Sequence, residues 1–381
     1  MSMSKAMVQK AVDEFRTRAN RQVVLVLQGG GALGGYQVGV YEALHEAGVE
    51  PDWIIAINAS IIAGNKPQER LARLNEFWNK VERPSAWPFV PLWTRIADTW
   101  SYWSTVVGGV PGFFEPHPPA FWGAHIPLGV DRAGFYSTAS LRQTLAELVD
   151  FSIINARSPR LTVGAANVHT SMMNYFDSRQ SEISAEHIMA SGALPPAFPA
   201  ICIDGEYYWD GGILSNTPTE VIFDDHPRRN SLIFAVHLWN PAGPVPQSIW
   251  EVLLRQKDIQ YSSRIASHIT RQQQTHRLRH VISQLVGYIP DDARQSEVVR
   301  ELAGHGCVTQ MHVVRLLAPR LENENHTKDI DFTPSGIGVR RKAGYEATMQ
   351  ALRQAPWQGR FDAIEGIILH ESMPDLAMAA E

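Results

Sequence analysis

A glycine-rich segment between an expected strand and an expected helix constrains this chain more than any other feature. Val23–Leu27 is an unbroken apolar run with β-branched residues, which predicts a strand buried on both faces of a parallel sheet. The sequence GGGALGG (29–35) follows, and apolar side chains at helical spacing predict a helix over Tyr36–Ala47, closed by Gly48. A glycine loop that opens a helix directs several backbone N–H groups at one point, where the helix dipole also favours negative charge. The segment therefore predicts an anion site on an α/β fold.

Two kinds of anion fit such a loop. Gly29, Gly31 and Gly34 spell G-x-G-x-x-G, which on its own predicts a nucleotide-binding enzyme. That interpretation also requires an acidic residue at the end of the second strand, to bind the ribose hydroxyls. The predicted second strand, Trp53–Ile57, is followed by Asn58 instead. The alternative is an oxyanion hole, whose N–H groups stabilise the developing negative charge of an acyl-transfer intermediate.

Two later motifs favour the oxyanion hole. Residues 190–199 read ASGALPPAFP, and residues 207–212 read YYWDGG. Together with the glycine loop, they resemble the patatin-like phospholipase family over about residues 20–225. The resemblance implies an α/β fold with a doubly wound, mostly parallel sheet flanked by helices in three layers. It also implies hydrolysis of a lipid acyl ester by a Ser–Asp dyad that needs no histidine.

The same resemblance assigns roles to individual residues. Asp210 is the expected base of the dyad, although an Asp before two glycines also suits a simple turn. The glycines expected in the oxyanion hole are Gly29, Gly30 and Gly31, and Gly34, Gly211 and Gly212 complete the matching motifs.

The nucleophile is where the chain departs from the family. The family places a serine in G-x-S-x-G between the second strand and the next helix, followed by a segment like AINA. Here residues 52–65 read DWIIAINASIIAGN, so AINA follows the strand directly and about five residues that would carry the serine are missing. Ser60 is the nearby candidate nucleophile. Asn58 and Ile62 flank it at the elbow offsets, and a β-branched residue is a poor substitute for glycine in a strained turn. The alternative is that Ser60 is an ordinary residue in the first turn of a helix.

The chain divides into three predicted parts: an N-terminal helix within 1–20, a patatin-like α/β domain over 21–225 and an α/β extension over 226–381. A Trp- and Pro-rich stretch, 82–122, predicts a cap that either packs on its own tryptophans or meets a lipid interface. The extension is similar to one carried by a bacterial subset of patatin-like proteins, with His326-Thr327-Lys328-Asp329 as a shared feature.

Several elements are predicted from periodicity. They are a helix over Pro67–Val81, a helix within Gly134–Val149 capped by Ser137 or Thr138, one or two helices over 245–287, and a helix that ends the stretch Ser335–Leu352. Strands are predicted over Ile233–Leu238 and Met311–Leu317, and a hairpin of Arg160–Ala166 with Asn167–Asp177 beside the first strand.

Composition narrows the function further. A chain of 381 residues with 44% hydrophobic content can bury a sizeable core, and a net charge of −5 argues against a nucleic-acid partner. Cys202 and Cys307 lie far apart, which indicates a reducing compartment. No apolar run approaches the ~20 residues of a spanning helix, and the start lacks a signal-peptide apolar region. A cytoplasmic location, with peripheral membrane contact as an option, is therefore expected.

No cofactor and no metal are expected. His276 and His280 lie four residues apart, but no third ligand follows in register. The sequence does not indicate an oligomeric state. Three hypotheses follow: a lipid acyl hydrolase using Ser60, a catalytically dead relative that binds a lipid or a protein partner, and a nucleotide-binding enzyme. The first two hypotheses both assume a patatin-like protein. In either case, the missing elbow predicts that ester hydrolysis is impaired.

Overall fold

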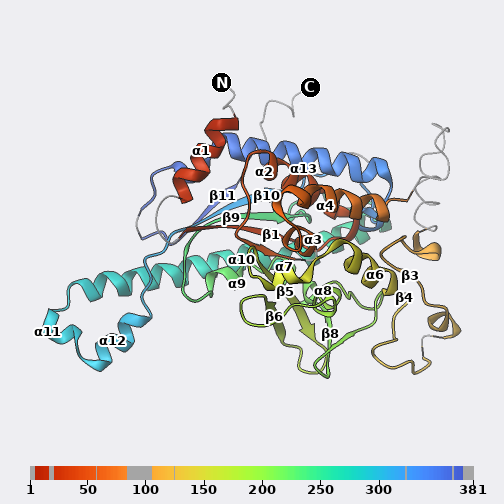
Figure 1. Cartoon of the computed structure of the whole chain (residues 1–381), viewed down its shortest axis with the longest axis horizontal. Helices are drawn as coiled ribbons and strands as arrows, with labels where there is room; N and C mark the ends of the chain where they lie inside the picture. Colours follow the sequence, from red (N-terminus) through yellow and green to blue (C-terminus); the bar gives the residue numbers. More distant parts are fainter. Residues whose placement is uncertain are drawn as a thin grey trace.

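A mostly parallel sheet with helices on both faces forms the centre of the protein (Figure 1). The computed structural model describes residues 5–16, 21–56, 58–83, 105–123, 125–321, 324–362 and 364–371. Nine strands of these ranges belong to the central sheet: β1 (Arg21–Leu27), β2 (Trp53–Ile55), β5 (Arg160–Asn167), β6 (Met173–Asp177), β7 (Ile201–Ile203), β8 (Glu206–Asp210), β9 (Asn230–His237), β10 (Met311–Leu317) and β11 (Ile367–Glu371). A separate two-stranded sheet pairs β3 (Glu115–Pro116) with β4 (Tyr136–Ser137).

The strand order is β11-β10-β9-β1-β2-β5-β8-β7, with β6 paired to β5 outside this path. β1 lies at the centre and pairs in parallel with β2 on one side and β9 on the other. The strands β6, β7 and β8 are antiparallel to their neighbours. This arrangement confirms the predicted α/β class with a mostly parallel sheet.

Helices cover the two faces of the sheet. The α-helices are α1 (Lys5–Arg16), α2 (Gly35–Glu46), α3 (Asn58–Ala63), α4 (Pro67–Val81), α6 (Ala139–Leu148), α7 (Phe151–Asn155), α8 (Ala185–Ala190), α9 (Glu220–Phe223), α10 (Ile249–Gly287), α11 (Asp291–Arg294), α12 (Glu297–Gly304) and α13 (Pro334–Gln354). Short 3-10 turns are η1 (Gly31–Gly34), η3 (Pro118–Trp122), η4 (Gly211–Ile213), η5 (Lys328–Ile330) and η6 (Pro356–Gln358).

Alternating side chains of β1 divide the core between the two faces. Leu25 and Leu27 join the larger cluster, which includes residues of α2, α4 and α13. Val24 and Val26 join a smaller cluster with Phe223 of α9. Because successive strand residues point to opposite faces, an apolar run without polar interruptions is required when both faces are covered. This confirms why Val23–Leu27 reads as continuously hydrophobic.

The helix α13 of the C-terminal extension packs directly on α2 (Figure 1). A Cβ atom at Gly39 would lie 1.8 Å from the Arg341 carbonyl oxygen, and one at Gly344 would lie 2.0 Å from the Tyr36 carbonyl oxygen. The two backbones therefore approach so closely that only glycine fits at either position. Arg341 adds two hydrogen bonds to the Glu42 carboxylate, of 2.8 and 2.9 Å. Sheet and helix packing thus join the extension to the rest of the fold.

Two sequence predictions need correction. The second strand ends at Ile55 rather than Ile57. The hairpin β5–β6 lies beside β2 and β8 rather than beside β1, because β9 occupies the remaining edge of β1. The stretch 245–287 forms one long helix, α10.

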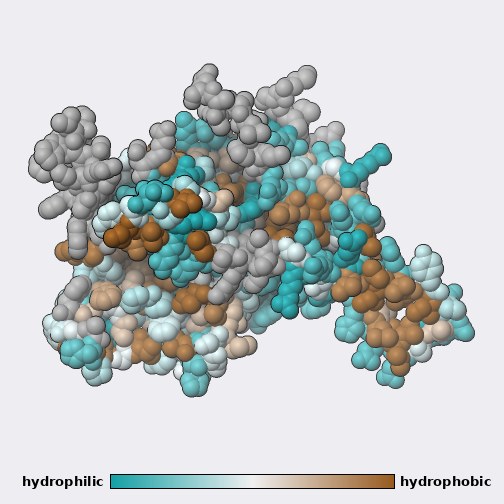
Figure 2. All heavy atoms as spheres, turned by 180° about the vertical axis from the view of Figure 1, so that it is seen from behind, coloured by the Kyte–Doolittle hydropathy of each residue, from teal (hydrophilic) through white to brown (hydrophobic). Residues whose placement is uncertain are grey.

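The second half of α10, with α11 and α12, projects from the body as an arm (Figure 1). Exposed apolar residues gather there, as Figure 2 shows from behind; among them are Leu285, Tyr288, Val298 and Leu302. Among the described residues, no helix combines the length and apolarity that crossing a membrane would require.

Much of the predicted cap cannot be compared with the fold. Trp87, Trp93, Trp100 and Trp103 lie outside the described residues. Trp122 is exposed at the end of η3. The described end of this stretch contributes Phe113 and Phe114 to an aromatic cluster with Phe198, with ring centroids 5.9 and 5.3 Å apart.

Candidate functional site

The glycine loop lies between the end of β1 and the start of α2, as predicted from the sequence. Gly31 has a φ of +54°, in the left-handed region that favours glycine. A Cβ atom there would lie 2.3 Å from the backbone oxygen of Asp329 in η5. Both the conformation and the close approach of a second backbone therefore require glycine at this position.

The side chain of Gln28, the residue just before the glycine loop, holds the start of the loop in place. Its buried side-chain oxygen accepts hydrogen bonds from the backbone amides of Leu238 (2.6 Å) and Trp239 (3.2 Å), just after β9. Its side-chain nitrogen donates to the Tyr261 carbonyl oxygen of α10 at 3.1 Å. One amide side chain thus ties the ends of β1 and β9 to α10. The sequence analysis missed this role because a single glutamine forms no motif.

Asp210 lies at the end of β8, opposite Ala165 near the carboxyl end of β5. Its carboxylate accepts a hydrogen bond of 2.7 Å from the Gly212 amide. Burial raises the pKa of Asp210 to about 6, whereas that hydrogen bond acts in the opposite direction. The raised pKa makes Asp210 a stronger base than an ordinary carboxylate while leaving it mostly ionised at neutral pH.

The glycine loop and the Asp210 turn meet, although they are far apart in the sequence. The Asn216 side-chain nitrogen donates to the Gly29 carbonyl oxygen at 3.2 Å, across 187 positions. A Cβ atom at Gly29 would lie 2.7 Å from the Asn216 Oδ1, and one at Gly212 would lie 2.8 Å from the same oxygen. The same Cβ atom at Gly212 would also lie 3.1 Å from an Asp210 carboxylate oxygen. Asn216 therefore bridges the two motifs, which the sequence analysis did not anticipate.

Gly211 also needs its small size. A Cβ atom at Gly211 would lie 2.5 Å from the Gly164 carbonyl oxygen of β5. Gly34, the last residue of η1, is buried where the loop enters α2. These two motif glycines support the backbone of the site, whereas Gly29, Gly30 and Gly31 form the loop itself.

Ser60 occupies a different environment. It lies in α3, where its side chain is fully buried and its carbonyl oxygen accepts the Gly64 amide at 2.8 Å. The preceding turn is tight, because β2 ends at Ile55 and Ala56 has a φ of +142°, which L-residues rarely adopt. Ile57 lies outside the described residues. The strand-to-helix junction therefore consists of very few residues, and Ser60 does not face solvent.

Three residues of the C-terminal extension, Trp239, Tyr261 and Lys328, form a wall beside the glycine loop. The Tyr261 ring of α10 packs against Trp239 with centroids 4.9 Å apart. Burial raises the pKa of Tyr261, and the negative charges of Asp329 and Asp210 add to this effect. Lys328 of η5 contacts Asp258 at 2.9 Å and lies 5.1 Å from the Trp239 ring centroid. The sequence hinted at this wall only through the stretch 326–329.

A metal centre finds no support within the described ranges, where no three His, Cys, Asp or Glu side chains group to hold an ion. His276 and His280 are both buried and bond to backbone oxygens of Phe223 and His276, at 3.4 and 3.0 Å.

Comparison with known proteins places this geometry in context. The family model described as patatin-like phospholipase matches residues 25–223, and one described as patatin phospholipase matches residues 259–363. The crystal structure of VipD from Legionella pneumophila is similar at 15% sequence identity and a TM-score of 0.36, covering 88% of this chain and 67% of that chain. No match to a curated protein was found.

Proposed function

Because the chain belongs to the patatin-like phospholipase family, we propose that it binds a lipid acyl ester between the glycine loop and Asp210, and that its ester hydrolysis is impaired. One observation carries the proposal. Asp210 and the glycine loop converge through Asn216, whereas Ser60, the serine nearest to the expected elbow, is enclosed in α3. The base and the oxyanion donors are retained without an accessible nucleophile at Ser60.

The family reaction needs both parts. In a Ser–Asp dyad, the serine hydroxyl gives its proton to the aspartate as its oxygen attacks the acyl carbonyl. The carbonyl oxygen gains negative charge, and backbone amides of a loop such as 29–31 stabilise it. Collapse of this intermediate expels the alcohol and leaves an acyl enzyme, which water then hydrolyses. Without the serine, the remaining groups can hold the ester carbonyl but cannot form the acyl enzyme.

The tight junction between β2 and α3 supports impairment. In hydrolases with a nucleophile elbow, the serine projects from a sharp strand-to-helix turn. Here the helix begins at Asn58, three residues after the strand ends at Ile55. The turn is therefore too short to contain a five-residue G-x-S-x-G segment.

Binding and turnover can be separated experimentally. The full-length protein is mixed with phosphatidylcholine vesicles that carry a fluorescent acyl chain, and both bound lipid and released fatty acid are measured. We expect lipid binding with a release rate no greater than that of the D210N and S60A variants. Release by the wild type that is lost in both variants would refute impairment and identify Ser60 as the nucleophile. Absence of lipid binding would refute the ester-binding role.

The nucleotide alternative gains no support from the geometry. Asn216 lies against Gly29, and the backbone of Asp329 lies against Gly31, so other protein atoms already approach two glycines of the loop. The second strand ends at Ile55 and is followed by Ala56, so neither of these positions supplies an acidic ribose ligand.

A further inference from the structure

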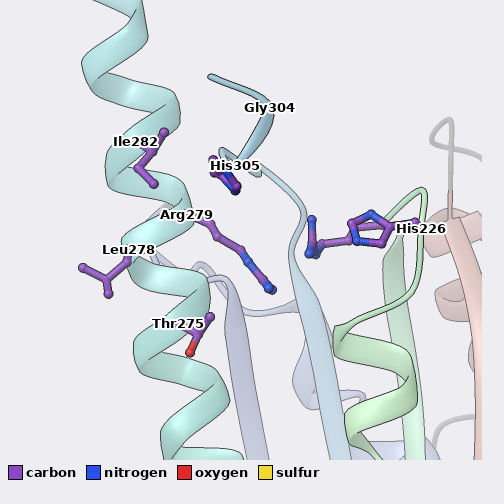
Figure 3. Close-up of a pocket in the computed structure, with 8 residues that line it drawn as sticks. His226, Thr275, Leu278, Arg279, Ile282, Gly304 and His305 are labelled. Atoms are coloured by element: carbon purple, nitrogen blue, oxygen red, sulfur yellow. The ribbon is translucent and has the colours of Figure 1, made fainter. Parts of the chain in front are cut away.

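A second concave site lies at the root of the projecting arm. It has a volume of about 580 Å³ and is lined by residues of three segments (Figure 3). The long helix α10 contributes Thr275, Leu278, Arg279 and Ile282, the α9–β9 connection contributes His226 and Arg228, and the end of α12 contributes Gly304 and His305. A cavity of this size suits a small ligand or a head group.

The site is separate from the glycine loop. His226 and Arg228 precede β9, and Gly304 and His305 precede β10, so the cavity lies at the amino ends of these two parallel strands. The glycine loop follows β1, and Trp239 follows β9, at the carboxyl ends. The eight residues of β9 separate the two edges by roughly 25 Å. One ligand of head-group size cannot occupy both sites.

Two arginines converge on this cavity. The Arg228 Nε and an Arg279 guanidinium nitrogen both donate to the Phe223 carbonyl oxygen, at 3.3 and 3.4 Å. Burial, and next the charge of Arg279, lowers the pKa of Arg228, so the two guanidinium groups repel each other at close range. An anion placed between them would replace this repulsion with attraction.

The acidic side chains nearest to Arg279 offset little of its charge. The carboxylate of Asp224 lies 3.6 Å from Arg279, longer than the 2.7–2.9 Å of a strong charged hydrogen bond, and it is mostly exposed. Asp225 is directed to Arg160 at 2.9 Å instead. Among the described residues, the polar contacts of the Arg279 side chain, to the Phe223 carbonyl oxygen and to Asp224, are therefore long.

The remaining lining defines the shape of the ligand. His226 and His305 line the cavity from different segments, and Arg279 extends toward it from α10 (Figure 3). The Thr275 hydroxyl already donates to the Arg271 carbonyl oxygen at 3.0 Å, so the arginines and histidines are the relevant donors. The planar guanidinium group matches the oxygens of a phosphate in a bidentate manner.

We propose that this cavity is a binding site for a phosphate group carried on a phosphoester. Arg228 and Arg279 hold the phosphate oxygens, and His226 and His305 border the opening. The phosphate can belong to a soluble phosphoester or to a lipid head group, and the two sources share this recognition chemistry. The proposal does not depend on the hydrolytic site.

The test uses the full-length protein and two kinds of probe. Glycerol 3-phosphate binding is measured by calorimetry, and vesicle binding by co-sedimentation with phosphatidylcholine vesicles with and without phosphatidic acid. The R279Q variant removes one of the two arginines. Its matched control is R277Q, which removes the same charge from an exposed position of the same helix. Loss of a charged phosphate contact should weaken binding roughly tenfold or more in R279Q only.

A second variant guards against loss of folding. H305E places a negative charge at the cavity from an exposed position, and H169E makes the same change at an exposed turn elsewhere. Binding of glycerol 3-phosphate that is weakened by R279Q and H305E, but not by the controls, supports a soluble phosphoester. The same pattern seen only with phosphatidic acid supports a lipid head group. Equal losses in the controls, or no binding of either probe, would overturn the proposal.

Discussion

The indole nitrogen of Trp239 donates a 2.9 Å hydrogen bond to the carbonyl oxygen of Gly29. Trp239 follows β9 and Gly29 follows β1, so this bond joins two adjacent strand ends at the glycine loop. Asn216 donates to the same oxygen at 3.2 Å. Trp239 and Asn216 therefore hold the Gly29 carbonyl group. The orientation of the backbone amides that follow Gly29 depends on both of these donors.

Replacing Trp239 by phenylalanine tests this bond. The ring is retained and the donor is lost, so the free energy of unfolding should fall by about 1 kcal/mol. Urea unfolding followed by circular dichroism measures the change. Trp250 is a matched control because it is exposed at the start of α10, and W250F should change stability by less than about 0.5 kcal/mol. Equal effects of the two variants would rule out a structural role for the Trp239–Gly29 bond.

The buried pair of Lys328 and Asp258 should be essential for the wall beside the loop. The two charged groups are 2.9 Å apart, with side-chain exposures of 5% and 8%, and the buried carboxylate of Glu324 lies 3.6 Å from the same ammonium group. K328M leaves a buried carboxylate without its partner, and should destabilise the protein by about 3–5 kcal/mol. Adding D258N should restore part of this loss, because it removes one of the two buried carboxylates that Lys328 contacts.

A surface pair provides the comparison for Lys328. Lys342 is 3.9 Å from Glu346 and its side chain is 76% exposed. K342M should therefore shift the midpoint of urea unfolding very little, by less than about 0.5 kcal/mol in free energy. A K328M variant as stable as K342M would show that the buried pair does not hold η5 in place.

The raised pKa of Asp210 predicts a pH-dependent stability difference. Its pKa of about 6 in the folded protein exceeds the ordinary value of 3.8, so the folded state binds this proton more tightly than the unfolded state. The stability contribution is complete below the unfolded pKa and is lost as the pH rises through about 6. As the pH rises from about 4 to about 8, the stability of D210N measured relative to that of wild type should therefore increase by about 2–3 kcal/mol.

Unfolding in urea across this pH range measures the Asp210 effect. D292N is the control, because Asp292 lies in α11 on the arm and is exposed. Its stability curve should run parallel to that of wild type. A D210N curve that is also parallel would mean that the Asp210 carboxyl is not desolvated.

Restoring the elbow should restore chemistry. Insertion of G-T-S-A-G after Ala56 supplies the strained turn and the serine that the β2–α3 junction lacks. We expect ester hydrolysis by this variant, and a loss of roughly 10²–10⁴-fold when D210N is added, because the general base is removed. Insertion of G-T-A-A-G is the matched control for folding. An inactive serine variant that melts as cooperatively as the alanine control would contradict the deletion hypothesis.

The sequence predicted regular elements well where local chemistry determines them. Pro67 at the first helical position and an apolar stripe fix α4 at Pro67–Val81, and β10 has the predicted bounds Met311–Leu317. The order of strands was harder, because periodicity records burial but not which strand is the neighbour. The second strand ended early because the turn begins at Ala56, whose positive φ has no sequence signal.

The site was predictable only where residues form a motif. The glycine loop and Asp210 stood out by spacing, and the structure brings these two segments together. Gln28, Asn216, Trp239 and Tyr261 are single residues from four separate segments, and they become a group only once β1, β9 and α10 are assembled. The family match supports a lipid substrate, whereas the roles of Asp210, Ser60 and the loop glycines stay predictions.

Fluorophosphonate labelling of the pure, folded protein tests the central claim most directly. The reagent reacts with activated serines, and intact mass with peptide mapping locates the label. Because Ser60 is fully buried in α3, we expect no label on Ser60 in a protein that melts cooperatively. Stoichiometric label on Ser60 would contradict the account and show an active acyl hydrolase with a rebuilt elbow.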